Sequence, residues 1–465
     1  MRSPSGVLQL LLLLAAGVAW AADEVYTCNA TQLLSSELIA EIRSYAPVVQ
    51  TIIDYVLRGP ERNRTYEELA KFVDRFGARI SGSRNLENAI DYMVELLGRQ
   101  GLDHVYTERV AVPHWVRGNE SAWIVRPRMQ RLNMLGLGGS VGTPPSGITA
   151  PVLVARGKVV VFDEEFSSYG RTVEYRENGA AVAERVGAVA ALVRSVTPFS
   201  IGSPHTGWMN YDRGEPRIPC ASITVEDAQL LRRLQDRGAD VQVHLIMDAQ
   251  NLPLTTSRNT IAELKGTTMP NEVVLVSGHL DSWDVGQGAM DDGGGAFISW
   301  RALALLRTLG LRPRRTLRAL LWTGEEEGVW GGRAYYERHG SQPEARRLLN
   351  LVMESDLGTF RPLGLKLAAT DPRARCMVAE VLRLFGSINA TRLTLGPDGP
   401  DIQPWVDAGV PGASLDTANK EYFYFHHTDG DAMTVEDPTN LDLCTALWAA
   451  SAFIFADLSE RLPRP

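Results

Sequence analysis

Residues 277–295 read SGHLDSWDVGQGAMDDGGG, and this stretch indicates how the rest of the chain is built. The apolar run 273–276 before it is typical of a buried strand, and a helix-like stretch follows the three glycines. Imidazole and carboxylate groups such as His279 and Asp291 together suit zinc and related divalent ions. Asp281 lies two residues beyond the histidine, on the same side of an extended chain, and could orient its ring. Taken alone, His-x-Asp is more often a loop of solvated acids.

Length and composition narrow the number of domains, the partners and the kinds of site that we expect. With 465 residues, of which 45% are hydrophobic, the chain can bury a large core and favours more than one domain. The net charge of −8 indicates no basic stripe, so we expect no nucleic acid partner. The four cysteines are widely spaced, which indicates neither a thiolate zinc site nor a dense disulfide framework, and their pairing stays open.

The N-terminus has the pattern of a targeting segment. Residues 1–22 contain a basic residue, an apolar run and small residues placed for signal peptidase, and the run is short for a membrane span. We therefore expect a secreted protein without a membrane span, which also occurs in the endoplasmic reticulum, Golgi apparatus and lysosome. Residues 23–32 could be a pro-segment of a zymogen. Four sequons are candidate glycosylation sites, at Asn29, Asn63, Asn119 and Asn389.

Three sequence patterns follow one another along the chain. Helical spacing dominates 33–100, short β-rich runs separated by Gly, Pro and Ser fill 115–247, and strands alternate with helices from 257 onward. In the last part the expected strands are 273–277, 316–322, 349–354, 364–368 and 413–416, and the expected helices are 293–308, 330–339, 373–385 and 438–458. This alternation predicts an α/β sheet sandwiched by helices, with a site outside the carboxyl ends of the strands.

Polar residues follow several of these strands where they end. His279 follows the first strand, Glu325–Glu327 follow the second, Asp356 follows the third, and His426–His427 come later. One acidic residue beyond a strand is ordinary solvation. Carboxylates or histidines beyond several successive strands, flanked by glycine, instead indicate a metal site.

Four motifs carry a resemblance to a known family. They are 276–295, VMESD at 352–356, GVPGASL at 409–415 and YFYFHHT at 422–428. On these motifs, nearly the whole mature chain resembles the co-catalytic zinc aminopeptidase and carboxypeptidase family. The resemblance implies an α/β fold, the zinc-exopeptidase α/β/α sandwich, with an inserted β-rich protease-associated domain.

The resemblance also divides the chain into parts. These are a signal peptide at 1–22, a possible pro-segment at 23–32, the N-terminal part of the catalytic domain at 33–115, a protease-associated-like insert at 116–255 and the main part of the zinc peptidase catalytic domain at 256–465. The N-terminal helices then belong to a catalytic domain whose chain is interrupted by the insert.

The same resemblance assigns metal ligands residue by residue. It implies that Asp291 bridges two zinc ions per chain. His279 and Asp356 would complete the shell of one ion, and Glu326 and His427 the shell of the other. All five ligands are nitrogen or oxygen donors, which suits zinc.

Catalysis is assigned in the same way. Glu325 falls on the general base of the family, and Glu327 is the glutamate we expect to be merely solvated. His427 is preferred over His426 because the family pattern His-Thr/Ser-x-x-Asp is completed by Asp431. Two such ions would activate a bridging water and polarise the scissile carbonyl, and the glutamate would carry the proton.

The resemblance implies a dinuclear zinc metallo-exopeptidase, a carboxypeptidase or dipeptidase that hydrolyses dipeptides and small peptides with free termini and forms a homodimer. One alternative is a zinc aminopeptidase acting on longer peptides. Another is a glutaminyl cyclase-like acyltransferase with one metal ion, and a third is a non-catalytic receptor-like protein of the same fold.

Overall fold

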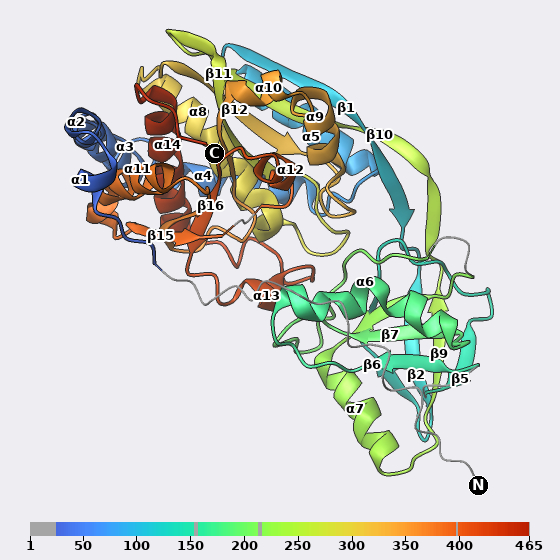
Figure 1. Cartoon of the computed structure of the whole chain (residues 1–465). Helices are drawn as coiled ribbons and strands as arrows, with labels where there is room; N and C mark the ends of the chain where they lie inside the picture. The colour runs from blue at the N-terminus through green and yellow to red at the C-terminus, as the bar shows by residue number, and fades with distance from the viewer. Residues whose placement is uncertain (1–24, 153–156, 213–215, 397–398, 465) are drawn as a thin grey trace.

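The computed structural model describes residues 25–464, apart from 153–156, 213–215 and 397–398. The predicted signal peptide lies outside the described residues. One sheet of eight strands and two sheets of four strands make up the described β-structure, and Figure 1 shows that the eight-stranded sheet and the two smaller sheets form separate parts of the molecule.

The main sheet is mixed, with a parallel centre. Its strands, in order across the sheet, are β1 (His104–Val116), β10 (Gln250–Leu264), β12 (Arg315–Trp322), β11 (Met269–His279), β13 (Leu349–Glu354), β16 (Gly412–Thr417), β14 (Pro362–Ala368) and β15 (Arg392–Leu395). β12, β11, β13 and β16 are parallel to one another. β10 pairs antiparallel with both β1 and β12, and β14 pairs antiparallel with β16 but parallel with β15. The sequence-predicted α/β class is confirmed.

Strand β11 shows why the sheet is covered on both faces. Val274 and Val276 pack into one large apolar cluster, while Val273 and Leu275 pack into a second cluster on the opposite face. Alternate residues of a strand point to opposite sides, so an unbroken apolar run requires two covered faces.

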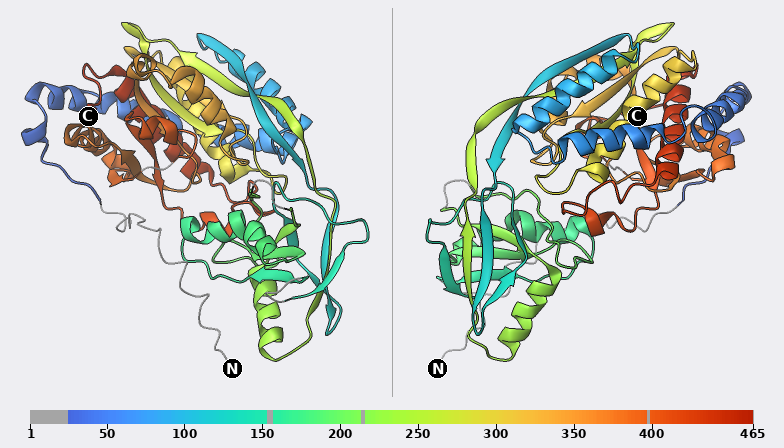
Figure 2. Two further views of the ribbon diagram at one scale, coloured as in Figure 1. Left: turned by 45° about the vertical axis from the view of Figure 1, so that its right-hand side comes forward. Right: turned by 180° about the vertical axis from the view of Figure 1, so that it is seen from behind.

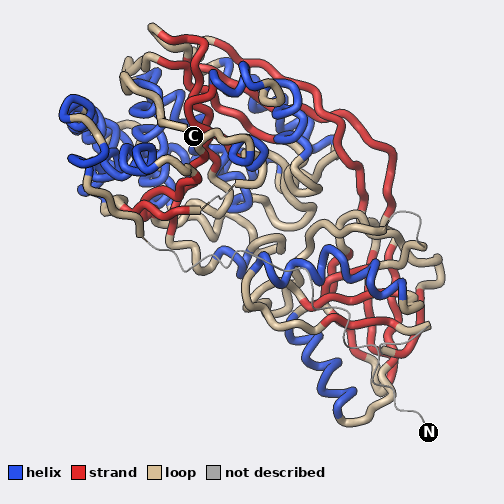
Figure 3. The backbone as a smooth tube through the Cα atoms, viewed as in Figure 1, coloured by secondary structure: helices blue, strands red, loops and turns tan. Residues whose placement is uncertain are grey.

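Helices supply both covers (Figure 3). The large cluster contains buried residues of α2 (Ser36–Ser44), α3 (Ala46–Leu57), α4 (Arg64–Phe76), α5 (Arg84–Gly98), α8 (Gly294–Thr308), α11 (Pro372–Leu382) and α14 (Pro438–Asp457). The opposite cluster contains residues of α9 (Trp330–His339) and α12 (Gln403–Asp407). Within the region 33–100, where helical spacing is expected, residues 36–57 form two helices, because α2 ends at Ser44 and α3 begins with proline in its first turn.

Helix α14 lies in the large apolar cluster of the main part. It is long and apolar enough to cross a membrane by length and composition, which the sequence reading did not recognise. Of its most apolar window, 83% is buried inside the protein, where it packs against α8 and α3. This environment is that of a core helix of a folded domain. Its N-terminus is capped by the Asp437 side chain, which accepts from the Asn440 N–H.

The region between β1 and β10 forms the smaller part of the molecule. One of its sheets has the order β3 (Gln130–Leu132), β2 (Glu120–Arg126), β9 (Gln242–Met247), β5 (Ile148–Pro151). The other has the order β4 (Met134–Gly136), β8 (Cys220–Ile223), β7 (Ala190–Arg194), β6 (Val159–Phe162). Two helices, α6 (Tyr169–Arg185) and α7 (Val225–Asp236), complete it, and we call residues 120–247 the insert module.

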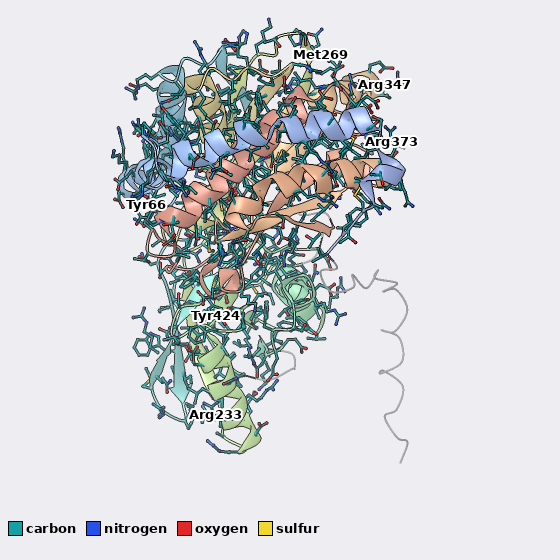
Figure 4. The ribbon with its side chains drawn as sticks, turned by 90° about the vertical axis from the view of Figure 1, so that its left-hand side faces the viewer. Tyr66, Arg233, Met269, Arg347, Arg373 and Tyr424 are labelled. Carbon is teal, nitrogen blue, oxygen red and sulfur yellow. A yellow bond between two sulfur atoms is a disulfide. The ribbon has the colours of Figure 1, made fainter. Side chains whose placement is uncertain are left out.

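The long antiparallel pair β1–β10 connects the insert module to the main sheet (Figures 1 and 2). A second connection lies at α13 (Tyr422–Phe425), where the ring of Tyr424 contacts that of Phe199 of the insert module in a tilted arrangement, with ring centroids 5.3 Å apart. Figure 4 shows Tyr424 at the level where the two parts meet.

The cysteine pairing that the sequence left open is resolved. Cys28 and Cys376 form a disulfide, which ties the segment before α2 to helix α11. Cys220 and Cys444 are free and buried.

Candidate metal centre and active site

The sequence-predicted site residues gather at one edge of the main sheet. β11, β12 and β13 are parallel, so their carboxyl ends meet there. A cleft of about 750 Å³ opens over this edge, and its lining comes from both parts of the chain. Tyr169, Arg176 and Trp208 line it from the insert module. The site therefore lies where the two parts meet.

His279 ends strand β11 and is fully buried. Its Nδ1 lies 3.0 Å from the backbone carbonyl oxygen of Asp281, which assigns the ring proton to Nδ1. Its Nε2 then faces the carboxylates, 3.2 Å from Asp291 and 3.3 Å from Asp356. This nitrogen is thus presented as a metal donor.

Asp281 supports the site differently from the expectation. Its carboxylate is 3.9 Å from Nδ1 of His279, and its backbone carbonyl takes the nearer position. The carboxylate instead accepts the N–H groups of Glu325 and Glu326, both at 3.2 Å. Asp281 therefore orients the His279 ring through its backbone carbonyl, and it holds the backbone of Glu325 and Glu326 through its carboxylate.

Asp291 lies at the centre of the site. One carboxylate oxygen faces His279, and the other lies 3.3 Å from Nε2 of His427 and 3.5 Å from Nε2 of His426. A single carboxylate thus reaches two groups of donors. The next residue, Asp292, is fully buried and accepts the N–H of His279 at 3.0 Å and that of Gly295 at 3.1 Å, so it fixes the backbone around the site.

The three glycines after Asp292 are closely packed and do not form a flexible linker. They lie where the chain enters α8, and a Cβ on Gly295 would collide with the backbone oxygen of Ser355. A side chain at Gly294 would meet Thr359. The glycines therefore let the helix approach the strand ends that carry the site.

His427 is held from three directions. Its Nε2 is 2.9 Å from Glu326, and its Nδ1 donates to the backbone oxygen of Thr206 in the insert module at 3.2 Å. Its φ of 60° is in the left-handed region, which a non-glycine residue adopts only where its surroundings hold it there. His426 stacks on it, with ring centroids 3.5 Å apart.

Asp431 holds the loop that carries Asp291. Its buried carboxylate accepts the backbone N–H groups of Ala289, Met290 and Asp291, at 3.0, 2.7 and 3.2 Å. The sequence indicated Asp431 only as the last residue of the His-Thr/Ser-x-x-Asp motif. In the structure its carboxylate also accepts backbone N–H groups of the loop that carries Asp291.

The donor set fits divalent cations. Three buried or nearly buried groups bring their donor atoms within 4.8 Å of one another: His279, Asp291 and Glu326; His279, Asp292 and Asp356; and Asp291, His426 and His427. Burial, followed by repulsion from Asp291, raises the pKa of Glu326 well above its usual range. Buried oxygens of Asp291 and Glu326 also have no hydrogen-bond partner among the described residues. Clustered carboxylates with unused oxygens are the environment that a cation stabilises.

Comparison with known proteins agrees with this chemistry. Carboxypeptidase Q of Xenopus laevis is 52% identical, over 94% of this chain and 96% of that protein, and carboxypeptidase Q of Homo sapiens is 49% identical over 92% and 93%. The model of peptidase family M28 matches residues 259–452. The chain belongs to peptidase family M28. As an M28 peptidase it is a zinc-dependent metallo-exopeptidase.

Solved structures support the fold. A peptidase M28 precursor from Shewanella amazonensis superposes with a TM-score of 0.85 at 30% identity, over 91% of this chain and 99% of that chain. A zinc aminopeptidase from Bacillus subtilis has a TM-score of 0.66 at 18% identity, over 87% and 97%, and shares the fold. The predicted family and α/β architecture are therefore confirmed.

One prediction about this M28 site was wrong. Glu327, expected to be solvated, is only 3% exposed and lies beside Ser81, and burial raises its pKa to about 8. Glu325, by contrast, keeps 15% of its side chain exposed, at 3.9 Å from Nε2 of His279. Burial raises its pKa well above the usual range, with repulsion from Asp356 adding to the effect.

The insert module supplies contacts that sequence reasoning missed. Thr206 orients His427 through its carbonyl, and Tyr169 lies edge-on to His426 with ring centroids 5.1 Å apart. No local spacing signals either contact, because both partners are more than 200 positions away in the sequence.

Proposed function

We propose that this M28 peptidase is a dinuclear zinc carboxypeptidase or dipeptidase that acts on dipeptides and small peptides with free termini. The observation that carries the proposal is the central position of Asp291, whose two carboxylate oxygens face different donors. Asp291 would bridge two ions, His279 and Asp356 would hold one, and Glu326 and His427 would hold the other. Ions about 3.5–4 Å apart are typical of such two-metal sites.

When bound, the zinc ions supply polarisation of the scissile carbonyl and acidification of the attacking water. Glu325 would accept the proton of that water and return it to the leaving amine. Asp281 would keep Glu325 and Glu326 in their separate positions by accepting both backbone N–H groups.

The substitution Glu325→Gln tests these roles, because it removes a base and no proposed ligand. We expect turnover to fall by about 10²–10⁴-fold, the usual contribution of a general base, with zinc content and thermal stability unchanged. Asp291→Ala is the matched variant, and it should lower zinc content at both positions. Near-normal activity of Glu325→Gln would overturn the assignment of the base.

A zinc aminopeptidase acting on longer peptides is the second candidate. The likeness to the Bacillus subtilis zinc aminopeptidase shows the fold alone and does not favour this activity. The names of the 52% and 49% identical relatives favour the carboxypeptidase. Product analysis on dipeptides blocked at the N-terminus or at the C-terminus separates the two.

We also propose the domain division 33–115, 116–255 and 256–465, with the middle part as a protease-associated-like insert. The separate sheets of the insert module and its position between β1 and β10 support this division. Homodimer formation belongs to the same proposal, and gel filtration coupled to light scattering tests it.

Secretion is likewise proposed, together with a presence in the endoplasmic reticulum, the Golgi apparatus and the lysosome. The disulfide suits an oxidising compartment. Asn29, Asn119 and Asn389 are exposed, whereas Asn63 is half-buried, so we expect glycans mainly at the first three. A cut after residue 32 would leave the pro-segment attached, because Cys28 is bonded to Cys376.

A further inference from the structure

Arg176 differs from the other buried arginines of the described chain. Arg194, Arg301 and Arg315 each face a carboxylate within 3.3 Å, and Arg79 donates to four backbone carbonyl oxygens. Arg176 is 6% exposed and forms no ion pair with any carboxylate of the described residues. A buried guanidinium without a counter-charge is costly, unless an anion enters from outside.

The contacts of Arg176 leave part of its donor capacity unused. Its Nη2 donates to the hydroxyl of Tyr169 at 3.0 Å, and its Nη1 makes a long contact of 3.5 Å to the backbone oxygen of Thr206. Its Nε has no hydrogen-bond partner. A guanidinium carries five N–H groups in a planar fork that matches a carboxylate, so several donors remain for a ligand.

The surroundings hold the guanidinium in this position. The Tyr169 ring lies 5.6 Å from its central carbon, and Gly207 packs against it so closely that a Cβ at Gly207 would collide with the guanidinium. Tyr169 in turn stacks on Phe423, with ring centroids 4.9 Å apart. The cation is thus preorganised on the insert wall of the cleft.

Arg176 also lies close to the metal centre. The Thr206 carbonyl that it contacts is the one that accepts from Nδ1 of His427, so the two side chains share one acceptor. Both side chains line the same cleft. In a peptide, three bonds separate the last scissile carbonyl carbon from the terminal carboxylate carbon, a path of roughly 4 Å. An anchor beside the metal centre therefore suits cleavage of the last peptide bond.

We propose that Arg176, held by Tyr169, binds the free C-terminal carboxylate of the substrate and so restricts this peptidase to the last peptide bond. This assignment rests on the proposed carboxypeptidase or dipeptidase function. It gives the insert module a direct part in substrate recognition.

The test compares a dipeptide with its C-terminal amide. For the zinc-loaded wild type we expect kcat/KM to be about 10- to 100-fold higher on the free acid, the range of one charge-assisted contact. Arg176→Gln should largely remove this preference by raising KM on the acid about 10- to 100-fold, while kcat/KM on the amide falls by a much smaller factor. Equal losses on both substrates, or an unchanged preference, would overturn the proposal.

A second variant guards against misfolding of Arg176→Gln. Tyr169→Phe keeps the stacked ring and removes only the hydroxyl that holds Nη2, so the preference for the acid should fall by a smaller factor. Arg333 also lines the cleft, from α9, and is exposed. If Arg333→Gln loses the preference for the acid and Arg176→Gln keeps it, the carboxylate binds elsewhere and the proposal fails.

Binding without turnover separates this inference from the proposed function. In the Glu325→Gln background, calorimetry should give a dissociation constant for the free dipeptide about 10- to 100-fold lower than for its amide, and Arg176→Gln should abolish the difference. A wild type that cleaves no dipeptide refutes the proposed function, while this binding difference still tests Arg176. A wild type that cleaves acid and amide equally well refutes the inference alone.

Discussion

Replacement of Asp431 tests how the loop carrying Asp291 is held in place. Its carboxylate is 4% exposed and accepts three backbone N–H groups, those of Ala289, Met290 and Asp291. Leaving a buried donor unsatisfied costs about 1–3 kcal/mol, so Asp431→Ala should lower the free energy of unfolding by about 3–9 kcal/mol, with entering water moving the value toward the lower end. Asp431→Asn keeps one oxygen for two of the donors and should cost about 1–3 kcal/mol.

The matched control is Asp442→Ala. Asp442 is also buried, but its carboxylate accepts one backbone N–H, that of Asn63, and it belongs to none of the three donor groups of the site. It should cost about 1–3 kcal/mol and leave zinc content unchanged. The assay is urea unfolding together with elemental analysis at pH 8, because burial raises the pKa of Asp431 to about 7 and that of Asp442 to about 6. If Asp431→Ala is no less stable than Asp442→Ala, or keeps full zinc, the reasoning is refuted.

Three further predictions concern the disulfide, a buried acid and the metal. Cys28→Ser should lower the free energy of unfolding by about 2–5 kcal/mol, and a reducing agent should then have no further effect on the urea midpoint. Burial raises the pKa of Glu436 to about 8, above its unfolded value, so this group contributes stability below about pH 4.3 that is lost as pH rises through 8, by up to about 1.4 kcal/mol per unit. Glu436→Gln should flatten that dependence in urea titrations, and an unchanged slope would contradict it. Chelation should lower the melting temperature more at pH 8 than at pH 5. The raised pKa values of Glu325 and Glu326 keep more of these carboxyl groups protonated at pH 5, so that less carboxylate repulsion remains once the metal is removed. Equal shifts at the two pH values would argue against carboxylate repulsion.

The sequence predicted the centre of the fold better than its edges. β12, β13 and α9 lie within one residue of the expected bounds, because buried apolar runs and amphipathic spacing are local signals. β1 and β10 were not expected. The first half of β10 is exposed and mostly polar, so it shows no apolar alternation.

In the site, too, the residues that stand in local motifs were predicted, whereas the contacts between distant segments were not. The five proposed ligands stand in recognisable motifs, and the structure brings them together around Asp291. The backbone contacts of Asp281 and Asp431, the burial of Glu327 and the contributions of the insert module depend on pairings between distant segments. No periodicity or spacing in one sequence encodes such pairings.

The order in which the proposed ligands occur along the chain affects how the enzyme is made. His427 is the last of them to be synthesised, and its orientation depends on Thr206, which is made much earlier. Domains form as the chain emerges from the ribosome, N-terminal parts first. Until His427 has emerged and reached Thr206, the nascent polypeptide has an incomplete hydrolytic centre. The proposed centre can therefore be completed only when nearly the whole chain has been synthesised, after the insert module and most of the main sheet.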